Sequence, residues 1–350
     1  MPLNVLILGA SYGSLLGTKL AMAGHNATLV CRKQTADLIN REGTEVRIKL
    51  RDEDAHRAIL SEDCAGRVDA STPEEVDPSA YDLVVLAMQE PQYSHPTLRS
   101  LLVRVAEARR PCLSIMNMPP LPYMKRFAQL SSTDLRAAYS DATVWDMFEP
   151  GLVSLCSPDP QAFRPPEEGA NVLHVGLPTN FKAAAFEDPA HTEMLRALER
   201  DIEAVRLDGN EVLVKLRTYD SLFVPFAKWS MLMTGNYRCV TDTGIRPIVE
   251  AVHDDLEESR RIYQSIDDMV CALGASESDL VPFEKYTKAA QGLLKPSSAA
   301  RAIVAGSQIE RVDRLIQALS RSLGMPNASI DLTVSRVDAA LEMHAKANAA

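Results

Sequence analysis

The chain has 350 residues, of which 46% are hydrophobic and 24% are charged, and its formal net charge is −10. This length is sufficient for two domains with a large core. The acidic balance argues against general binding to nucleic acid or to an anionic membrane surface, because both require a basic surface.

Cysteine usage and the N-terminus narrow the class of protein further. Six cysteines occur without a C-x-x-C pair and seven histidines are scattered, so we expect reduced thiols and no metal site. No apolar run has the length of a transmembrane helix. The N-terminus begins with strand-forming residues and not with a secretory leader, so we expect a cytoplasmic protein without a membrane partner.

Residues 4–33 predict a strand, a turn, a helix and a second strand. Val5–Leu8 is an apolar run that stops at Gly9, which is typical of a buried parallel strand. The next residues have the apolar spacing of a helix that covers a sheet, and residues 27–30 predict the second strand. Such a unit binds a nucleotide, whose pyrophosphate lies at the helix N-terminus. The candidate cofactor-binding residues of the turn are Gly9, Ala10, Ser11, Tyr12 and Gly13.

The turn departs from the dinucleotide-binding fingerprint, which has glycine at its first, third and sixth positions. Those positions hold Gly9, Ser11 and Ser14, and Gly13 is out of phase. An ordinary α/β unit that needs small residues at this turn is the alternative interpretation.

Strand ends supply the other candidate cofactor contacts. Arg32 and Lys33 follow the second strand, where an acidic residue would hold the ribose hydroxyl of NAD, so they favour NADP(H). Met88 ends a later buried strand, whose carboxyl end should point toward the cofactor. Asn117 follows another strand and precedes two prolines. It either presents its amide rigidly or lies in a surface turn.

The elements up to residue 210 indicate an N-terminal α/β domain with a doubly wound, Rossmann-type sheet. Helices are predicted over residues 36–43, 97–110 and 192–205. Strands are predicted over residues 45–50, 81–88, 111–116, 143–148, 152–156 and 171–175. Residues 52–78 are polar and are expected to be irregular or hairpin-like. We therefore assign residues 1–210 to an NADP-binding domain.

Helical periodicity dominates from residue 211 onward. Helices are predicted over residues 219–233, 245–273, 282–294, 299–323 and 331–346. We therefore expect an all-α C-terminal domain over residues 211–350, with the functional site in the cleft between the two domains. The long C-terminal helices are candidates for a homodimer interface.

A lysine interrupts a nearly apolar stretch near the start of the helical half. Lys228 and Asn236 are eight residues apart, just over two helical turns, so both lie on the same broad side of a helix. A lysine in apolar surroundings can have a lowered pKa and can donate or accept a proton in catalysis. The alternative is a lysine whose head group reaches water.

Further polar candidates lie beyond residue 295. Ser297 or Ser298 is suited to cap a helix N-terminus. Glu310 stands in a helical pattern with Arg311 and Arg314, and a solvated salt bridge is its simplest interpretation.

This order of motifs resembles the ketopantoate reductases, NADPH-dependent enzymes related to the 6-phosphogluconate dehydrogenases. Residues 13–17, Gly-Ser-Leu-Leu-Gly, are similar to that family's Gly-Ser-Leu-Phe-Gly. Residues 23–32 are similar to its helix end and second strand. The resemblance covers most of the chain and implies reduction of a 2-keto acid, or of a related small carbonyl compound, to the alcohol.

The resemblance also implies roles for individual residues. It makes Lys228 the general acid, with Asn236 and Glu310 orienting the reaction and binding the substrate. It implies that Ser298 holds the substrate's carboxylate, and it places Asn117 after the fourth strand of the family. One straight helix would separate Ser298 from Glu310 by about 18 Å. A shared site therefore requires a break, which we expect at residues 306–307.

Departures from the family's pattern leave two other hypotheses open. The asparagine expected four residues after the lysine is Leu232, and the lysine expected after the strand is replaced around Met88. These departures motivate an inactive NADP-binding sensor as one alternative. The other is an opine dehydrogenase-like enzyme, which joins an amino acid to a keto acid, because residues 9–14 align with that family's Gly-Ala-Gly-Asn-Gly-Gly. Its histidine would be His191 or His253.

Overall fold

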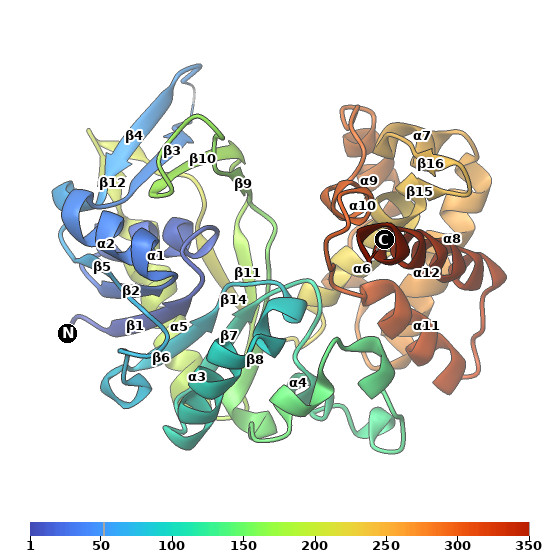
Figure 1. The fold of residues 1–350 in the computed structure, drawn as a ribbon, viewed down its shortest axis with the longest axis horizontal. Coiled ribbons are helices and arrows are strands. Elements are labelled where there is room, and N and C mark those ends of the chain that lie inside the picture. Colours follow the sequence, from blue (N-terminus) through green and yellow to red (C-terminus); the bar gives the residue numbers. More distant parts are fainter. Residues whose placement is uncertain (52, 350) are drawn as a thin grey trace. The chain divides into compact units, whose positions relative to one another are not determined.

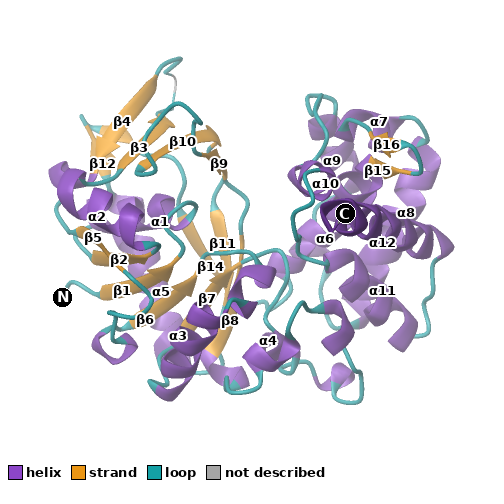
Figure 2. Ribbon diagram, in the orientation of Figure 1, coloured by secondary structure: helices purple, strands orange, loops and turns teal. Residues whose placement is uncertain are grey.

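The computed structural model describes residues 1–51 and 53–349 and divides into two compact units. Asp52, where the expected irregular segment begins, and Ala350, the last residue of the predicted second domain, lie outside the described residues. The sheet unit comprises residues 1–88, 92–126 and 143–222. The helical unit comprises residues 89–91, 127–142 and 223–350. Figure 1 follows the chain through both units, and Figure 2 shows that strands dominate the first and helices the second.

The sheet unit is built on an eight-stranded sheet in the order β14-β11-β8-β7-β6-β1-β2-β5. Strands β5, β2, β1, β6, β7 and β8 are mutually parallel, β11 is antiparallel to β8, and β14 is parallel to β11. The strands are β1 (Asn4–Leu8), β2 (Asn26–Val30), β5 (Val68–Ser71), β6 (Leu83–Leu86), β7 (Cys112–Ile115), β8 (Val153–Ser157), β11 (Phe181–Ala184) and β14 (Leu216–Tyr219). The predicted doubly wound sheet is confirmed.

Helices cover this sheet because its central strands are apolar on both faces. Every residue of β6 and four of the five residues of β1 are buried, as expected for central parallel strands. The helices of this unit are α1 (Gly13–Met22), α2 (Lys33–Glu42), α3 (Pro96–Glu107), α4 (Leu121–Met124) and α5 (Pro189–Ala204). The chain moves from β1 to β2 on one side and later returns to β6 on the other. A ligand crevice is therefore expected beside β1.

A smaller sheet in the order β4-β3-β10-β9 joins distant parts of the sheet unit. Its strands are β3 (Glu45–Lys49), β4 (His56–Leu60), β9 (Gln161–Phe163) and β10 (Val172–Leu177). A hairpin of two short strands follows α5, formed by β12 (Arg206–Leu207) and β13 (Asn210–Glu211).

One predicted strand of this unit is wrong. Residues 143–148 were expected to be extended, but the 3₁₀ helix η6 (Ala142–Trp145) occupies the first half of them, and turns follow. Trp145 is 1% exposed, and its ring lies 5.6 Å from Tyr93 and 5.9 Å from Phe148, centroid to centroid. This apolar stretch therefore buries most of its apolar residues in local turns around Trp145. Among the described residues, it does not pair with a neighbouring strand.

The helical unit contains seven α-helices among the described residues: α6 (Lys228–Met231), α7 (Ile248–His253), α8 (Leu256–Ala272), α9 (Phe283–Ala290), α10 (Ser298–Val304), α11 (Val312–Ser322) and α12 (Ala328–Ala349). A two-stranded ribbon, β15 (Val240–Thr241) and β16 (Gly244–Ile245), lies between α6 and α7 in the sequence. No helix in the described part of the chain is long and apolar enough to cross a membrane. Residues 211–222, which the sequence assigns to the second domain, belong to the sheet unit because β14 pairs with β11.

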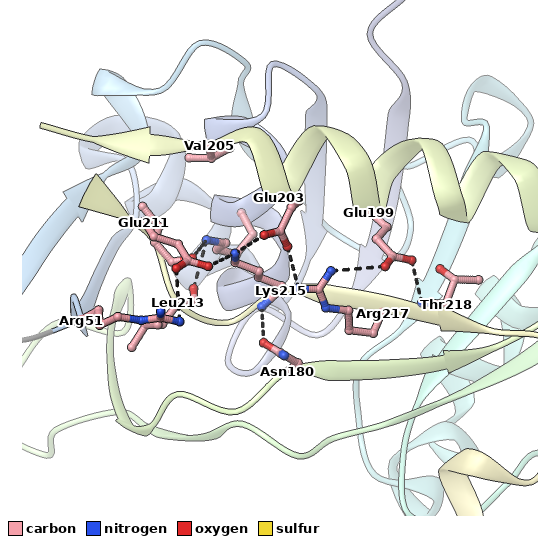
Figure 3. Close-up of polar contacts among 12 residues, drawn as sticks. Arg51, Asn180, Glu199, Glu203, Val205, Glu211, Leu213, Lys215, Arg217 and Thr218 are labelled. Atoms are coloured by element: carbon pink, nitrogen blue, oxygen red, sulfur yellow. Dashed lines mark hydrogen bonds and ion pairs between the residues drawn. The ribbon is translucent and has the colours of Figure 1, made fainter. Parts of the chain in front are cut away.

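A buried lysine anchors α1 to the segment before β14. Lys19 is 1% exposed, and its Nζ donates a hydrogen bond to the carbonyl of Leu213 at 3.0 Å. The nearby Lys215 is also buried and donates to the carboxylates of Glu203 and Glu211 (Figure 3). Burial, followed by repulsion from Lys215, lowers the pKa of Lys19 from 10.5 to about 7.

This shift predicts a pH-dependent stability. A lysine with a lowered pKa in the folded chain takes up a proton on unfolding between about pH 7 and pH 10.5, so the free energy of unfolding rises with pH there. One such group contributes at most about 1.4 kcal/mol per pH unit. Lys19→Met should flatten this rise, measured by urea unfolding at several pH values. Lys288→Met, at an exposed position of α9, is the control, and equal slopes in wild type and Lys19→Met would contradict the prediction.

Candidate active site

The predicted glycine turn follows β1 directly and lies against the end of β6. Gly9 has φ 111°, a backbone conformation that side chains disfavour. A Cβ atom placed there would lie 2.6 Å from Cγ of Met88 and 2.9 Å from the carbonyl oxygen of Ala87. The N–H of Gly9 donates to the carbonyl of Val30 at 3.0 Å. Glycine is therefore required here, because the turn, β2 and the end of β6 meet at this point.

The turn leads into the N-terminus of α1, where backbone N–H groups face an anion in nucleotide-binding folds. Gly13 is the first helical residue, and Tyr12 is the N-cap without a side-chain capping hydrogen bond. The hydroxyl of Ser14 donates back to the carbonyl of Ser11 at 2.8 Å. Ala10 is buried, whereas Ser11 is exposed. A helix start without a side-chain cap suits a pyrophosphate.

Tyr12 can contact a pyrophosphate at the N-terminus of α1 only through its backbone. Its hydroxyl donates to the carbonyl of Pro160 at 2.8 Å, and its ring packs edge-on against Phe181 with centroids 5.8 Å apart. Burial raises the pKa of the Tyr12 phenol well above its ordinary value. The side chain therefore ties α1 to the segment that follows β8.

The two cations after β2 differ in their surroundings. Lys33 is the first residue of α2, and its Nζ lies 3.0 Å from a carboxylate oxygen of Asp37, with both side chains exposed. Arg32 is the N-cap of α2 and is exposed. None of the described residues forms an ion pair with Arg32. Of the two cations predicted to favour NADP(H), Arg32 is thus the one whose charge is not already balanced by a carboxylate.

Met88 and Asn117 follow neighbouring strands on the other side of β1. Met88 comes two residues after β6, and its N–H donates to the hydroxyl of Tyr93 at 3.1 Å. Asn117 comes two residues after β7 and is half-buried. The predicted cofactor residues therefore follow the carboxyl ends of β2, β1, β6 and β7, which are consecutive strands of one parallel sheet. That edge is where ligands bind in doubly wound folds.

In the helical unit, a π turn interrupts the helix that carries Lys228 and Asn236. Residues Lys228–Met231 form α6, and residues Leu232–Asn236 form the π-helical segment η9. In a regular α-helix, residues eight apart are offset by about 80°. A π turn accommodates one additional residue, so the pair is spaced like residues seven apart, with an offset of only about 20°. By this helix geometry, the π turn places the two residues nearer to one line along the helix than a regular α-helix would.

Tyr286 of α9 fixes the π turn. Its hydroxyl donates to the carbonyl of Met231 at 3.2 Å. A Cβ atom on Gly235 would overlap this hydroxyl and would lie 3.1 Å from a methyl group of Ile248. Glycine at 235 is therefore what permits Tyr286 to approach the helix backbone. Sequence reasoning missed both residues, although a glycine inside an apolar helical pattern is the signal that points to such a close approach.

Glu310 is buried two residues before α11, which differs from the solvated surface salt bridge of its simplest interpretation. It is 6% exposed, and its Oε1 accepts a hydrogen bond from the N–H of Glu90 at 3.4 Å. Its backbone carbonyl accepts from the hydroxyl of Tyr237 at 2.6 Å. Arg311 instead pairs with Asp313 at 2.8 Å. Arg314, the other expected partner, pairs with a different aspartate, Asp338.

The serine pair before α10 has two distinct environments. Ser297 is the N-cap, since its Oγ accepts from the N–H of Ala300 at 3.0 Å, and it donates to the carbonyl of Asn236 at 2.7 Å. Ser298 is the first helical residue and is exposed. Ser297 therefore secures the end of the π turn, while the Ser298 side chain is accessible to solvent.

The predicted break between Ser298 and Glu310 is confirmed. Helix α10 ends at Val304, the chain turns at Gly306 with φ 73°, and α11 begins at Val312. The helical periodicity over residues 299–323 therefore corresponds to two helices, α10 and α11.

Glu90 is a buried acid that sequence reasoning missed. It follows β6 by four residues and is 2% exposed. Its carboxylate accepts a hydrogen bond from the N–H of Ser140 at 3.1 Å, and burial raises its pKa. The two histidines of the opine hypothesis lie in different units, His191 in α5 and His253 in α7.

The architecture and these side chains define a Rossmann-type unit combined with a helical unit. No protein-family model matches this sequence, and no curated protein does. Solved structures do match it over nearly their whole length. One, from Ralstonia solanacearum MolK2 and assigned as a ketopantoate reductase, has a TM-score of 0.67 at 16% identity and covers 99% of each chain.

Two further structures show the breadth of this likeness. A ketopantoate reductase from Staphylococcus aureus, described as dimeric, has a TM-score of 0.61 at 14% identity over 98% of this chain and 100% of its own. A D-mandelate dehydrogenase in complex with NADH has a TM-score of 0.62 at 12% identity over 97% of this chain and 99% of its own. The chain therefore has the fold of the ketopantoate reductases, as predicted.

Proposed function

We propose that the protein is an NADP-dependent oxidoreductase that reduces a 2-keto acid or a related carbonyl compound to the alcohol. The observation that carries the proposal is the π turn between Lys228 and Asn236, in a chain that shares its fold end to end with dehydrogenases of this kind. Single π turns within α-helices occur often at functional sites.

In the proposal, the sheet unit holds the cofactor. The backbone of residues 9–13 binds the pyrophosphate at the N-terminus of α1, and Arg32 pairs with the 2′-phosphate. Met88 and Asn117 line the same edge of the sheet and contact the nicotinamide half. The bound NADPH supplies a hydride.

The helical unit supplies the proton in this proposal. Lys228 donates it to the carbonyl oxygen while the carbonyl carbon accepts the hydride, so that a ketone becomes an alcohol. Asn236 donates a hydrogen bond that orients the substrate, and Glu310 helps to position Lys228 and the substrate. Ser298 binds the substrate's carboxylate from the accessible first turn of α10.

A two-stage experiment tests this function. NADPH and NADH are first titrated against the protein, and a panel of 2-keto acids that includes ketopantoate is then screened by the absorbance of the reduced nicotinamide. We expect tighter binding of NADPH and substrate-dependent oxidation. NADPH binding without turnover across the panel would favour the sensor hypothesis. Oxidation that requires an added amino acid would favour the opine hypothesis.

We also propose a homodimer that forms through α12. Leu332 and Met343 are 51% and 60% exposed and lie eleven residues apart, about three helical turns, so they share one face. Size-exclusion chromatography with light scattering should report a dimer. Leu332→Asp should shift it to a monomer.

A further inference from the structure

The segment between β8 and β10 starts at the carboxyl edge of the large sheet and is attached at both ends. At its start, the carbonyl of Pro160 accepts the hydroxyl of Tyr12, the N-cap of α1. At its end, the amide of Asn171 donates to the carbonyl of Gly43 at 2.9 Å, just beyond α2. Nearby, a Cβ on Gly169 would lie 3.9 Å from the side chain of Leu38 in α2. We call residues 160–171 the bridging segment, because they link the start of α1 to α2.

Arg164 lies in the middle of the bridging segment, directly after β9. It is half-buried, and no hydrogen bond or ion pair joins it to any of the described residues. Burial lowers the pKa of its guanidinium, and Cys31, which follows β2, is the group whose charge opposes that shift. Arg164 in turn affects Cys31: burial raises the pKa of the Cys31 thiol to about 11, and the charge of Arg164 opposes this increase. A half-buried cation without a counter-ion favours binding of an anion.

Other charges around the bridging segment are already balanced. Asp159, just before it, lies 3.0 Å from Nζ of Lys182. Glu168, within it, lies 2.7 Å from a guanidinium nitrogen of Arg47. Near the end of β2, Lys33 is paired with Asp37. Two cations are left without a carboxylate partner among the described residues of this region, Arg32 and Arg164.

We propose that Arg164 binds the 2′-phosphate of NADP together with Arg32, and that the bridging segment is therefore what selects NADP over NAD. The inference rests on the proposed function. Arg32 is exposed and immediately follows Cys31, the residue whose charge acts on Arg164. Both arginines are therefore associated with the carboxyl end of β2, where the adenosine ribose lies in such folds. Two arginines can hold a phosphate dianion through several charge-assisted hydrogen bonds. This pairing has no local sequence signal, because 132 residues separate Arg32 from Arg164.

Direct binding measurements test the proposal without any turnover. The dissociation constants of NADPH and NADH are measured by nicotinamide fluorescence, and adenosine 2′,5′-bisphosphate is compared with AMP by calorimetry. Arg164→Gln should weaken binding of NADPH and of the bisphosphate about 10–100-fold, since a charged hydrogen bond contributes about 1.5–3 kcal/mol. Binding of NADH and AMP should stay within about twofold. Arg164→Lys should recover part of the lost affinity. It restores the charge but lacks the planar guanidinium group, which can donate two parallel hydrogen bonds to a phosphate.

Arg67→Gln is the matched control, because it removes the same charge from the amino end of β5, where Arg67 is paired with Asp69. It should leave all four affinities unchanged. Equal weakening of NADPH and NADH by Arg164→Gln would overturn the proposal and leave the proposed function intact. So would unchanged NADPH binding in that variant while Arg32→Gln loses it. A wild-type protein that binds neither dinucleotide would overturn the proposed function itself, and this inference with it.

Discussion

Lys228→Ala is expected to lower the turnover of a reducible 2-keto acid about 10²–10⁴-fold, the usual contribution of a positioned general acid. Its affinity for NADPH should stay within about twofold, because the proposed cofactor contacts all come from the sheet unit. The mutant and wild-type proteins are compared by steady-state kinetics and by fluorescence titration of NADPH. Loss of turnover with retained binding separates a proton donor from a residue that supports the fold.

Two controls sharpen this experiment. Lys288→Ala removes an exposed lysine from α9 in the same unit and should leave turnover unchanged. Added methylammonium should partly rescue Lys228→Ala, because a small amine can occupy the space of the missing side chain and donate the proton. Normal turnover in Lys228→Ala would exclude this lysine as the general acid.

Gly235→Ala is expected to reduce both stability and turnover. The new methyl group would overlap the hydroxyl of Tyr286, and overpacking of this kind costs about 1–3 kcal/mol. The helix can relieve the overlap only by rearranging the π turn. That movement would rotate Asn236 out of line with Lys228. We expect a lower midpoint of thermal unfolding and a turnover that falls by more than the loss of folded protein explains.

A second substitution tests whether this clash is the cause. Tyr286→Phe removes the overlapping hydroxyl at the cost of the hydrogen bond to Met231, about 1 kcal/mol. In the double mutant Gly235→Ala/Tyr286→Phe, the two effects should be less than additive by about 0.5–3 kcal/mol, as for residues in contact. Strict additivity would show that Gly235 and Tyr286 act independently and that the π turn has another cause.

The parts of the fold that the sequence predicts well are those with strong local signals. The βαβ unit at the N-terminus is one, because β1 contains an uninterrupted apolar run and Gly9 marks the turn. The break at Gly306 is another, since a glycine at a helix end has a direct conformational cause. The strands β5, β9, β11 and β14 are short and of mixed polarity, and only their pairing partners, distant in sequence, define them.

The candidate site also contains residues with a local sequence signal and residues without one. Lys228 and Asn236 can be found from the sequence because a lysine in an apolar helix is unusual. Their alignment cannot, since a π turn depends on Tyr286, which lies 50 residues further along. Arg164 and Glu90 have no local pattern either. Each becomes visible only when burial and neighbouring charges from distant segments are known.

The way the helical unit is put together constrains how the chain folds. Residues 89–91 and 127–142 belong to it, although they are made long before residues 223–350. The contact between Glu90 and Glu310 closes a loop of 220 residues, and contacts of such separation form slowly. During synthesis, Glu90 therefore stays in contact with water until the C-terminal helices have left the ribosome. A gene fragment that encodes only residues 223–350 should consequently yield an incompletely folded, aggregation-prone product.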